Sequence, residues 1–398
     1  MRRTVLTTAG IGVLMVGVTA CGGGDAAGGN SSEPIVIAYN GDLSGGFSIT
    51  GQGALKGMKA YFDAANAAGG VAGRQIKLVT ADDAADVNRA LSNVQQLLNQ
   101  DKPAVLTGIT VSSICQALGD TVAEAKVPLF CTATAPSQIS PPTPNPWAFQ
   151  PQSGPNFQVA PTLALIKDLV PKPAPRVAYI HFDSAAQHGF GDGLSKAVQQ
   201  RGWTLAAKEI VPLTASPDIR AQASKLVAAQ PDVVVSLMTD KNSKLLQETL
   251  RVQGFKGPII QNPDTGPDIL NQINDPDFYL MTHSYIDNTP NDKITGDENW
   301  ARMVKAFEAA KLPLTTSYAA RGYLYGAAIA AALESCNGCT GDKLREAILS
   351  STAPTDGITP GDISFTNDNH QGVKALPIYR RNNGVEHVGN FDIGTGLS

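Results

Sequence analysis

Short apolar strands alternate with amphipathic helices through most of this chain, and this alternation limits the possible fold more than any other feature. In a first series, the apolar runs lie at residues 35–39, 75–79, 104–108 and 127–131. In a second series, they lie at residues 176–182, 205–211, 233–237 and 258–261. Strands that alternate with helices form parallel sheets covered by helices. The sequence therefore predicts an α/β protein with two lobes, which a chain of 398 residues can accommodate.

The rest of the chain predicts a return to the first lobe. Three helical segments follow the second series, at Trp300–Lys311, Tyr318–Glu334 and Asp342–Ser350. Two or three strands then follow, between Asp362 and Phe391. We expect one lobe to comprise residues 34–150 and 287–357, and the other residues 151–286 and 358–398. Seven prolines within residues 136–155 predict a loop and a crossover there, without structure of its own.

The N-terminal segment has the pattern of a targeting signal. Arg2 and Arg3 precede an apolar run that is too short to span a bilayer, and the run ends in Val18-Thr19-Ala20-Cys21, which resembles a bacterial lipobox. We expect a lipoprotein signal peptide over residues 1–20, lipidation of Cys21, and a flexible tether over residues 21–33. The protein would then be extracytoplasmic and lipid-anchored to the cell membrane. A plain secretory signal with an incidental cysteine is the alternative, and Arg2-Arg3 leaves the twin-arginine route open.

The cysteine count agrees with export. Four cysteines remain beside Cys21, namely Cys115, Cys131, Cys336 and Cys339. An even number in an oxidising compartment favours two disulfides. Cys115 and Cys131 are expected at the same sheet edge, and Cys336 and Cys339 can close a small loop. A redox C-x-x-C motif is the rival for the second pair, although a helical pattern precedes it.

Charge and motifs exclude several other functions. The net charge is −4 and no basic block is present, so we expect no nucleic-acid partner. The glycines at Gly51 and Gly53 lie too far from the preceding strand for a dinucleotide loop. No nucleophile with a matching base is visible, and the five histidines show no metal-ligand spacing. We therefore expect no enzyme activity, no cofactor and no metal.

The strand–helix–strand stretch from Lys102 to Pro136 suggests a binding site. Its helix is predicted to begin at Ser112-Ser113 and to run to Lys126, and the strand after it ends in the polar loop that starts at Thr132. A helix N-terminus offers free N–H groups and favours an anion. We interpret this edge as half of a site for a small carboxylate, with an ordinary N-cap at Ser112 as the alternative.

Together these motifs resemble the leucine/isoleucine/valine-binding proteins, which are type I solute receptors of ABC importers. The matching segments are Leu43–Gly45 with Gly51, Ala67–Arg74, Asp82-Asp83, Ser112-Ser113, Val127-Pro128, Ala133–Ala135 and Phe190–Gly193. The resemblance implies two Rossmann-like lobes with parallel sheets, joined by a hinge of three crossovers, with a ligand enclosed between the lobes. It also implies a monomer that delivers its ligand to a permease and its ATPase.

The resemblance assigns roles to ten residues. Ser112 or its neighbour Ser113 would bind the ligand carboxylate, together with backbone groups of the loop Thr132-Ala133-Thr134. Asp264 would receive an ammonium group and Phe190 would cover the apolar part of the ligand. Three further residues occupy positions of pocket tyrosines, namely Thr50, Thr239 and Tyr318.

The departures from the family pattern leave the ligand open. Phe190 lacks the usual tyrosine hydroxyl, and Ala85 occupies a position where the family has a disulfide cysteine. The residues expected to bind the ligand carboxylate match the family pattern better than the residues expected to contact the ligand side chain. We therefore expect a branched-chain or other amino acid, or a related small carboxylate. A tethered sensor that binds a ligand and signals to a membrane partner is the rival function.

Overall fold

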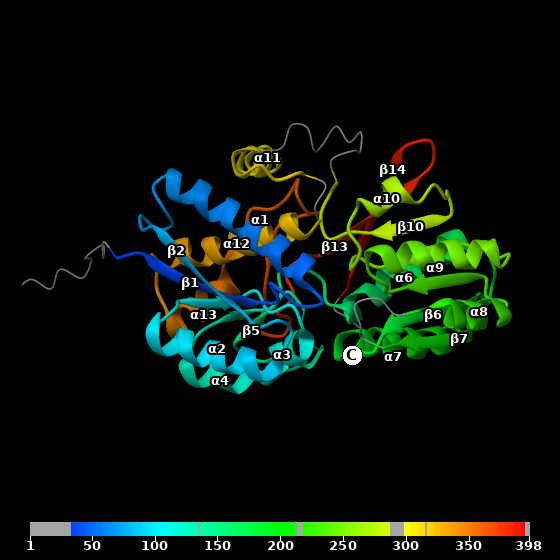
Figure 1. Ribbon diagram of the computed structural model, residues 1–398, viewed down its shortest axis with the longest axis horizontal. Coiled ribbons are helices and arrows are strands. Elements are labelled where there is room, and N and C mark those ends of the chain that lie inside the picture. The colour runs from blue at the N-terminus through cyan, green and yellow to red at the C-terminus, as the bar shows by residue number, and fades with distance from the viewer. Residues whose placement is uncertain (1–32, 134–135, 213–217, 287–297, 315–316, 395–398) are drawn as a thin grey trace, which may run out of the picture. The chain divides into compact units, whose positions relative to one another are not determined.

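The computed structural model describes residues 33–133, 136–212, 218–286, 298–314 and 317–394 (Figure 1). The predicted signal peptide, Cys21 and nearly all of the predicted tether lie outside the described residues. No helix in the described ranges is long and apolar enough to cross a membrane. Within those same ranges, no group of three or more potential metal ligands comes together.

The first lobe is built on a sheet of five parallel strands. The strand order is β2 (Ile76–Asp82), β1 (Ile35–Gly41), β3 (Val105–Thr107), β4 (Leu129–Phe130) and β5 (Ala148–Phe149). Side chains alternate between the two faces, so Ile37 and Tyr39 of β1 join one core while Ala38 joins the other. This alternation means that helices must cover both faces.

Helices do cover both faces of the first sheet, as Figure 1 shows. One layer contains α1 (Ser48–Ala67), α11 (Glu298–Ala310), α12 (Ser317–Ser335) and α13 (Gly341–Ser350). The other layer contains α2 (Val87–Gln100), α3 (Ser112–Ala117) and α4 (Gly119–Ala125). Helices α11 to α13 come late in the chain, so the chain returns to the first sheet after the strands β6 to β10 of the other sheet.

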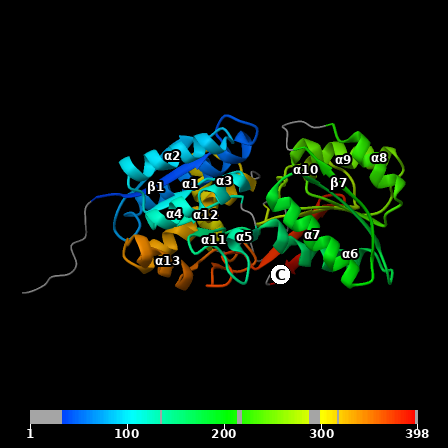
Figure 2. The same cartoon turned by 90° about the horizontal axis from the view of Figure 1, so that it is seen from below.

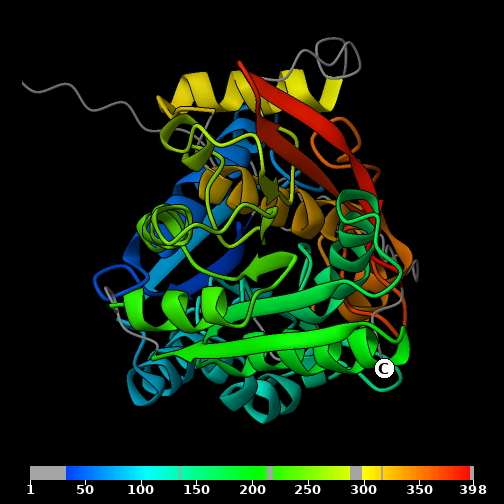
Figure 3. The same ribbon diagram turned by 90° about the vertical axis from the view of Figure 1, so that its right-hand side faces the viewer.

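The second lobe is built on a mixed sheet of seven strands. Its order is β14 (Val385–Asp392), β13 (Ala375–Arg381), β10 (Phe278–Met281), β9 (Ile259–Gln261), β8 (Val233–Ser236), β6 (Arg176–Phe182) and β7 (Thr204–Val211). Strands β6 to β10 are parallel, whereas the hairpin β13–β14 pairs antiparallel at the edge (Figure 3). The hairpin turn contains the pair Asn383 and Gly384, and Asn383 has a positive φ of 55°, which asparagine tolerates well.

The second sheet also has helices on both faces. Helices α6 (Val159–Leu169) and α7 (Ala185–Gln200) cover one face. Helices α8 (Arg220–Ala228), α9 (Asp240–Val252) and α10 (Ile269–Gln272) cover the other (Figure 2). The α/β prediction with two Rossmann-like lobes is therefore confirmed.

Three passages of the chain connect the two sheets, and hydrogen bonds hold them side by side. The first passage follows β5 and includes the 3-10 helix Pro155–Gln158, and the third precedes β13. Gln150 N donates to His370 O at 2.9 Å, and Val373 N donates to Pro151 O at 2.8 Å. The second passage joins through Ser153 Oγ, 3.2 Å from His283 Nδ1. Its continuation, residues 287–297, lies outside the described residues.

The proline-rich stretch differs from its prediction. Residues 140–155 contain strand β5, which pairs with β4, and α5 (Pro136–Ile139) lies just before them. The prediction of no structure there was wrong because two in-register residues suffice for an edge strand. The single helix predicted from Ser112 to Lys126 was also wrong, since it breaks at Leu118 into α3 and α4.

The strand pairing departs at one point from the predicted division into lobes. β12 (Ile363–Ser364) pairs with β11 (Thr352–Ala353), and the ring of Phe365 lies 5.4 Å from that of Phe149 in the first lobe. His370 also stacks on Phe149, with ring centroids 4.5 Å apart. The chain therefore re-enters the second lobe after the predicted boundary at residue 358, at a point closer to β13.

Both expected disulfides form in the structure. Cys115 and Cys131 are bonded, and they join the start of α3 to the end of β4. Cys336 and Cys339 are bonded across the loop between α12 and α13. The Cys115–Cys131 disulfide links these two elements at the sheet edge where the binding site was predicted.

Candidate functional site

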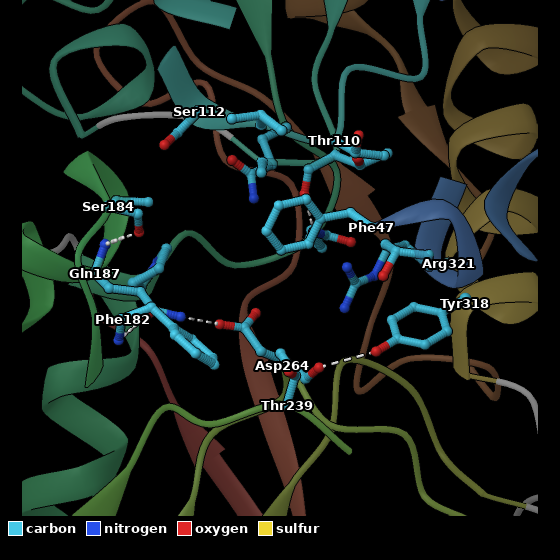
Figure 4. Close-up of a pocket in the computed structure, with 18 of the residues that line it drawn as sticks. Phe47, Thr110, Ser112, Phe182, Ser184, Gln187, Thr239, Asp264, Tyr318 and Arg321 are labelled. Carbon is cyan, nitrogen blue, oxygen red and sulfur yellow. Dashed lines mark hydrogen bonds between the residues drawn. The ribbon is translucent and has the colours of Figure 1, made fainter. Parts of the chain in front are cut away.

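A pocket of about 110 Å³ lies between the carboxyl ends of the two sheets. Figure 4 shows side chains converging on it from both lobes. Its lining from the first lobe and the first crossover comprises Phe47, Thr50, Thr110, Val111, Ser112, Thr132, Ala133, Gln150, Gln152, Ser153, Pro155, Tyr318 and Arg321. Its lining from the second lobe comprises Phe182, Ser184, Ala186, Gln187, Thr239 and Asp264. Ligands of open α/β sheets bind at this edge, so the location agrees with the fold.

The first-lobe wall begins where β3 and β4 end. Ser112 is buried against the pocket at the first residue of α3. Thr132 also lines the pocket, but its Oγ1 donates to Ile109 O at 2.7 Å and its carbonyl accepts from Gln152 Nε2 at 2.5 Å. Thr132 therefore shapes the wall, and its carbonyl is already paired. Because α3 has only six residues, the predicted contribution of a long helix dipole at Ser112 is reduced.

The first crossover supplies two buried amides to the same wall. Gln150 and Gln152 are almost fully buried, and the Oε1 atom of each has no hydrogen-bond partner among the described residues. A buried acceptor without a partner costs about 1–3 kcal/mol. Two such acceptors beside a pocket favour a ligand that donates hydrogen bonds.

The second-lobe wall depends on the start of α7. Ser184 is the N-cap, and its Oγ accepts from Gln187 N at 3.4 Å. Gln187 in turn accepts from Phe182 N at 2.6 Å and donates to Leu237 O at 3.1 Å. These bonds connect β6, α7 and the end of β8, so the apolar ring of Phe182 is held at the pocket edge.

Asp264 places a carboxylate in the pocket from the loop after β9. Its Oδ2 accepts from Gln187 Nε2 at 3.1 Å and from Asn262 Nδ2 at 2.9 Å. Its Oδ1 has no partner among the described residues, and neither amide donor carries a charge. The carboxylate is thus oriented by neutral groups while one oxygen stays open to the pocket (Figure 4).

Helix α12 closes the pocket with Tyr318 and Arg321, one helical turn apart. Tyr318 Oη donates to Asp264 O at 3.1 Å, which joins the two lobes across the pocket. Arg321 Nη2 donates to Pro263 O at 3.3 Å, and its guanidinium carbon lies 5.3 Å from the centre of the Tyr318 ring. The Arg321 side chain is 6 % exposed, and its Nε has no hydrogen-bond partner in the described part of the chain.

Behind Arg321, a buried histidine occupies the hinge. Burial lowers the pKa of His283 well below its usual range, and the positive charge of Arg321 lowers it further. His283 is therefore neutral at neutral pH, with Nδ1 beside Ser153 Oγ. Its Nε2 has no partner among the described residues.

Seven of the ten predicted ligand-binding residues line the pocket. They are Thr50, Ser112, Thr132, Ala133, Thr239, Asp264 and Tyr318. The structure brings these side chains together from both lobes, while their binding roles stay predictions. Thr134 lies outside the described residues.

The other two predicted residues do not line the pocket. Ser113 is exposed and does not contribute to the lining. Phe190 is 0 % exposed and belongs to the core between α7 and the second sheet. Its predicted role was wrong because Phe190 lies inside α7, which begins five residues earlier at Ala185 and buries this side chain. Phe182 is an aromatic residue that does line the second-lobe side.

Sequence reasoning missed several lining residues that carry visible signals. Ser184 and Gln187 have the spacing of a capping box, which marks the start of α7 correctly. Arg321 lies one helical turn after Tyr318, in a helix whose charged residues are Arg321 and Glu334. A single cation early in an apolar helix signals a buried functional group. Gln150 and Gln152 carried no such signal, because their burial depends on the crossover path.

A two-lobed α/β chain with a polar pocket at the facing sheet edges is the architecture of a solute-binding protein. The family model described as periplasmic binding protein matches residues 34–385. The chain therefore belongs to the periplasmic binding protein family. Members of this family bind solutes as non-enzymatic components of transport systems.

Curated relatives match over parts of their length. An amino acid binding protein of Pseudomonas aeruginosa is 35 % identical over 79 residues, which cover 20 % of this chain and 21 % of that protein. Leu/Ile/Val-binding protein homolog 3 of Brucella melitensis is 26 % identical over 227 residues, which cover 57 % and 60 %. The aligned segments thus span less than two thirds of either relative.

Solved structures share the fold over most of the chain. An ABC transporter substrate-binding protein from Sphaerobacter thermophilus has a TM-score of 0.77 at 22 % identity, covering 92 % of this chain and 100 % of that one. A branched-chain amino acid ABC transporter protein from Thermus thermophilus, with bound valine, has a TM-score of 0.77 at 18 % identity, covering 92 % and 98 %. A fatty acid ABC transporter substrate-binding protein from Thermomonospora curvata has a TM-score of 0.75 at 18 % identity, covering 91 % and 93 %. One fold thus accompanies ligands as different as valine and fatty acids, so the ligand must be inferred from the site.

Proposed function

We propose that this protein captures an amino acid or a related small carboxylate outside the cytoplasm and delivers it to an ABC permease. The observation that carries the proposal is the pocket to which both lobes contribute, with the Asp264 carboxylate open toward it. No covalent chemistry is required, because binding by closure of two lobes is sufficient to enclose and release a solute.

The proposed roles follow the two walls of the pocket. The first lobe, with Ser112 at its edge, faces the carboxylate end of the ligand. Asp264 pairs with an ammonium group, and Phe182 and Phe47 cover apolar parts. A buried ammonium needs a charged or polar partner, which the open Oδ1 of Asp264 supplies. A volume of about 110 Å³ favours small ligands over long acyl chains.

Export and anchoring belong to the same proposal. The lipobox-like sequence ending at Cys21 supports removal of the signal peptide and lipidation of that cysteine. Cys21→Ser should abolish incorporation of labelled fatty acid and release the exported protein from the membrane fraction. An unlipidated wild type would refute the anchor while leaving ligand capture unaffected.

A ligand screen tests the capture function directly. Amino acids, organic acids and aromatic acids are added to the protein from Glu33 onward, and the melting temperature is measured. A true ligand at a hundred times its Kd stabilises the folded state by about 2.7 kcal/mol. Absence of stabilisation by every amino acid and small carboxylate would contradict the proposed ligand class.

Asp264→Asn then tests the ammonium site. The substitution keeps the shape and removes the charge, so affinity for the amino acid found in the screen should fall by about 1.5–3 kcal/mol. Asp63→Asn, on the exposed face of α1, is the matched control and should leave affinity unchanged. Calorimetric titration measures both. Equal affinities of wild type and Asp264→Asn would remove Asp264 from the ligand contacts.

A further inference from the structure

Arg321 is a buried cation whose charge nothing in the described protein neutralises. The pocket lining contains one positive and one negative side chain, Arg321 and Asp264. No carboxylate oxygen among the described residues lies within the 4.0 Å ion-pair distance of the Arg321 guanidinium. Burying a charge without a charged partner is costly. We propose that Arg321 binds the anionic group of the ligand, so that a negative charge on the ligand strengthens binding.

The contacts of Arg321 leave most of its donors available. A guanidinium carries five N–H donors in a planar fork. Among the described residues, a single hydrogen bond uses one of them, from Nη2 to the neutral carbonyl of Pro263. The Nε atom is buried without an acceptor. Figure 4 shows the guanidinium of Arg321 pointing into the pocket between Phe47 and Tyr318. A fork of this kind fits the two oxygens of a carboxylate.

Asp264 provides the opposite charge on the facing lobe. Its carboxylate and the Arg321 guanidinium line one pocket without reaching ion-pair distance. The neutral amides of Gln187 and Asn262 hold Asp264 in place, and the Tyr318 ring lies against Arg321. A ligand that carries both charges would satisfy both groups at once. This step rests on the proposed function, and it moves the charge recognition of the carboxylate from the start of α3 to α12.

A purely structural role for Arg321 explains less. A hydrogen bond to the Pro263 carbonyl needs a donor but no charge. A largely buried structural arginine normally pairs with a carboxylate, as Arg251 does with Asp275 at 2.7 Å within the second lobe. Arg321 lacks such a pair in the described residues, and it faces the cavity to which both lobes contribute.

The test compares a charged ligand with its uncharged amide. L-leucine and L-leucinamide are titrated by calorimetry into wild type, Arg321→Gln and Arg321→Lys. Arg321→Gln should weaken leucine binding by about 10- to 100-fold and leave leucinamide binding unchanged, because leucinamide has no carboxylate. Arg321→Lys keeps the charge and loses the fork, so its preference for leucine over leucinamide should be smaller than that of wild type but retained.

The controls separate this inference from the proposed function. Arg345→Gln removes a positive charge from α13, where Arg345 lies over Trp147 outside the pocket lining, and should bind leucine like wild type. If wild type binds leucine, and Arg321→Gln shows the same ratio of leucine affinity to leucinamide affinity as wild type, Arg321 is not the anion receptor. The capture function then stands. If wild type binds no amino acid and no small carboxylate, the proposed function fails and this inference fails with it. If Arg321→Gln does not fold by circular dichroism, Arg321→Lys decides: equal weakening of leucine and leucinamide overturns the inference.

Discussion

His283 illustrates how a single buried polar residue links two crossovers of the hinge. It lies on the second passage between the lobes and contacts Ser153 on the first, so two crossovers meet at one imidazole. Burial, and then the nearby charge of Arg321, lowers the pKa of His283. Burial also lowers the pKa of His181 and of His370. The folded protein therefore keeps all three rings neutral under conditions in which an unfolded chain would protonate them.

The sign of the resulting pH dependence can be stated. An unfolded histidine titrates near pH 6.5, and a folded one with a depressed pKa does so at lower pH. As the pH falls below about 6.5, the unfolded state binds a proton that the folded state does not, and the free energy of unfolding falls by up to about 1.4 kcal/mol per pH unit per group. Asp83 acts in the opposite sense below pH 6, because burial raises its pKa to about 6.

His283→Asn should reduce this loss of stability in acid. The asparagine can still reach Ser153 but does not titrate, so the slope of unfolding free energy against pH between 6.5 and 5 should be shallower than in wild type. Urea denaturation at several pH values measures the slope. The comparison with wild type cancels the contribution of Asp83. Parallel curves for the two proteins would show that His283 is not the group that resists protonation.

At the scale of elements, the close packing of α1 on α12 positions the pocket. A Cβ atom added to Gly322 would lie 1.8 Å from Ala54 O, and one added to Gly57 would lie 1.8 Å from Ala319 O. The two helices thus contact each other backbone to backbone at a reciprocal pair of glycines. Tyr318 and Arg321 precede Gly322 on the same helix, so their reach into the pocket depends on this spacing.

Gly322→Ala should therefore damage both stability and binding. The added methyl group forces the helices apart, and overpacking of this kind costs roughly 1–3 kcal/mol. Gly193→Ala in α7 is the matched control, since its Cβ would meet Val159 Cγ2 at 3.4 Å and alanine favours a helix by about 0.5–1 kcal/mol. In urea denaturation, the free energy of unfolding should be lower for Gly322→Ala than for wild type, and higher for Gly193→Ala. A Gly322→Ala protein as stable as wild type would refute the close-contact argument.

At the scale of the whole molecule, two hydrogen bonds connect α12 of the first lobe to the loop after β9 of the second. Tyr318 Oη donates to Asp264 O, and Arg321 donates to Pro263 O. Both bonds lie at the pocket, so they form only when the lobes are close together. A ligand that contacts both lobes shifts the population toward this arrangement.

Tyr318→Phe should shift the balance toward the open arrangement. Losing one interlobe hydrogen bond costs about 0.5–1.5 kcal/mol, which weakens ligand binding by about 2- to 10-fold. Small-angle scattering of the free protein should show a larger radius of gyration than wild type. Tyr179→Phe, which removes a hydroxyl contact with Ser195 inside the second lobe, is the control and should change neither quantity. Identical scattering and affinity for Tyr318→Phe and wild type would show that the Tyr318 hydroxyl does not stabilise the closed arrangement of the lobes.

Periodicity identified most elements, and local chemistry placed several of the pocket residues. The strands and helices of both lobes follow from apolar spacing, as the match of the predicted and observed ranges for β6 shows. Ser112 was found because it starts a helix after a strand, whereas Asp264 was assigned by the family resemblance. Phe190 was misplaced because its role came from the family pattern alone, although the capping pair Ser184 and Gln187 starts the helix earlier and puts Phe190 inside it.

The sequence alone determined the α/β class and the two-lobe organisation, because periodicity is a local property of the chain, and the cysteine count favoured the two disulfides that the structure contains. Only the tertiary structure decided which side chains share the pocket. Arg321 is more than fifty residues from Asp264 in the chain, and their approach depends on α12 packing back onto the first lobe after the second is complete. Long-range packing of this kind leaves no local pattern, so the paired charges at the pocket became visible only in the folded chain.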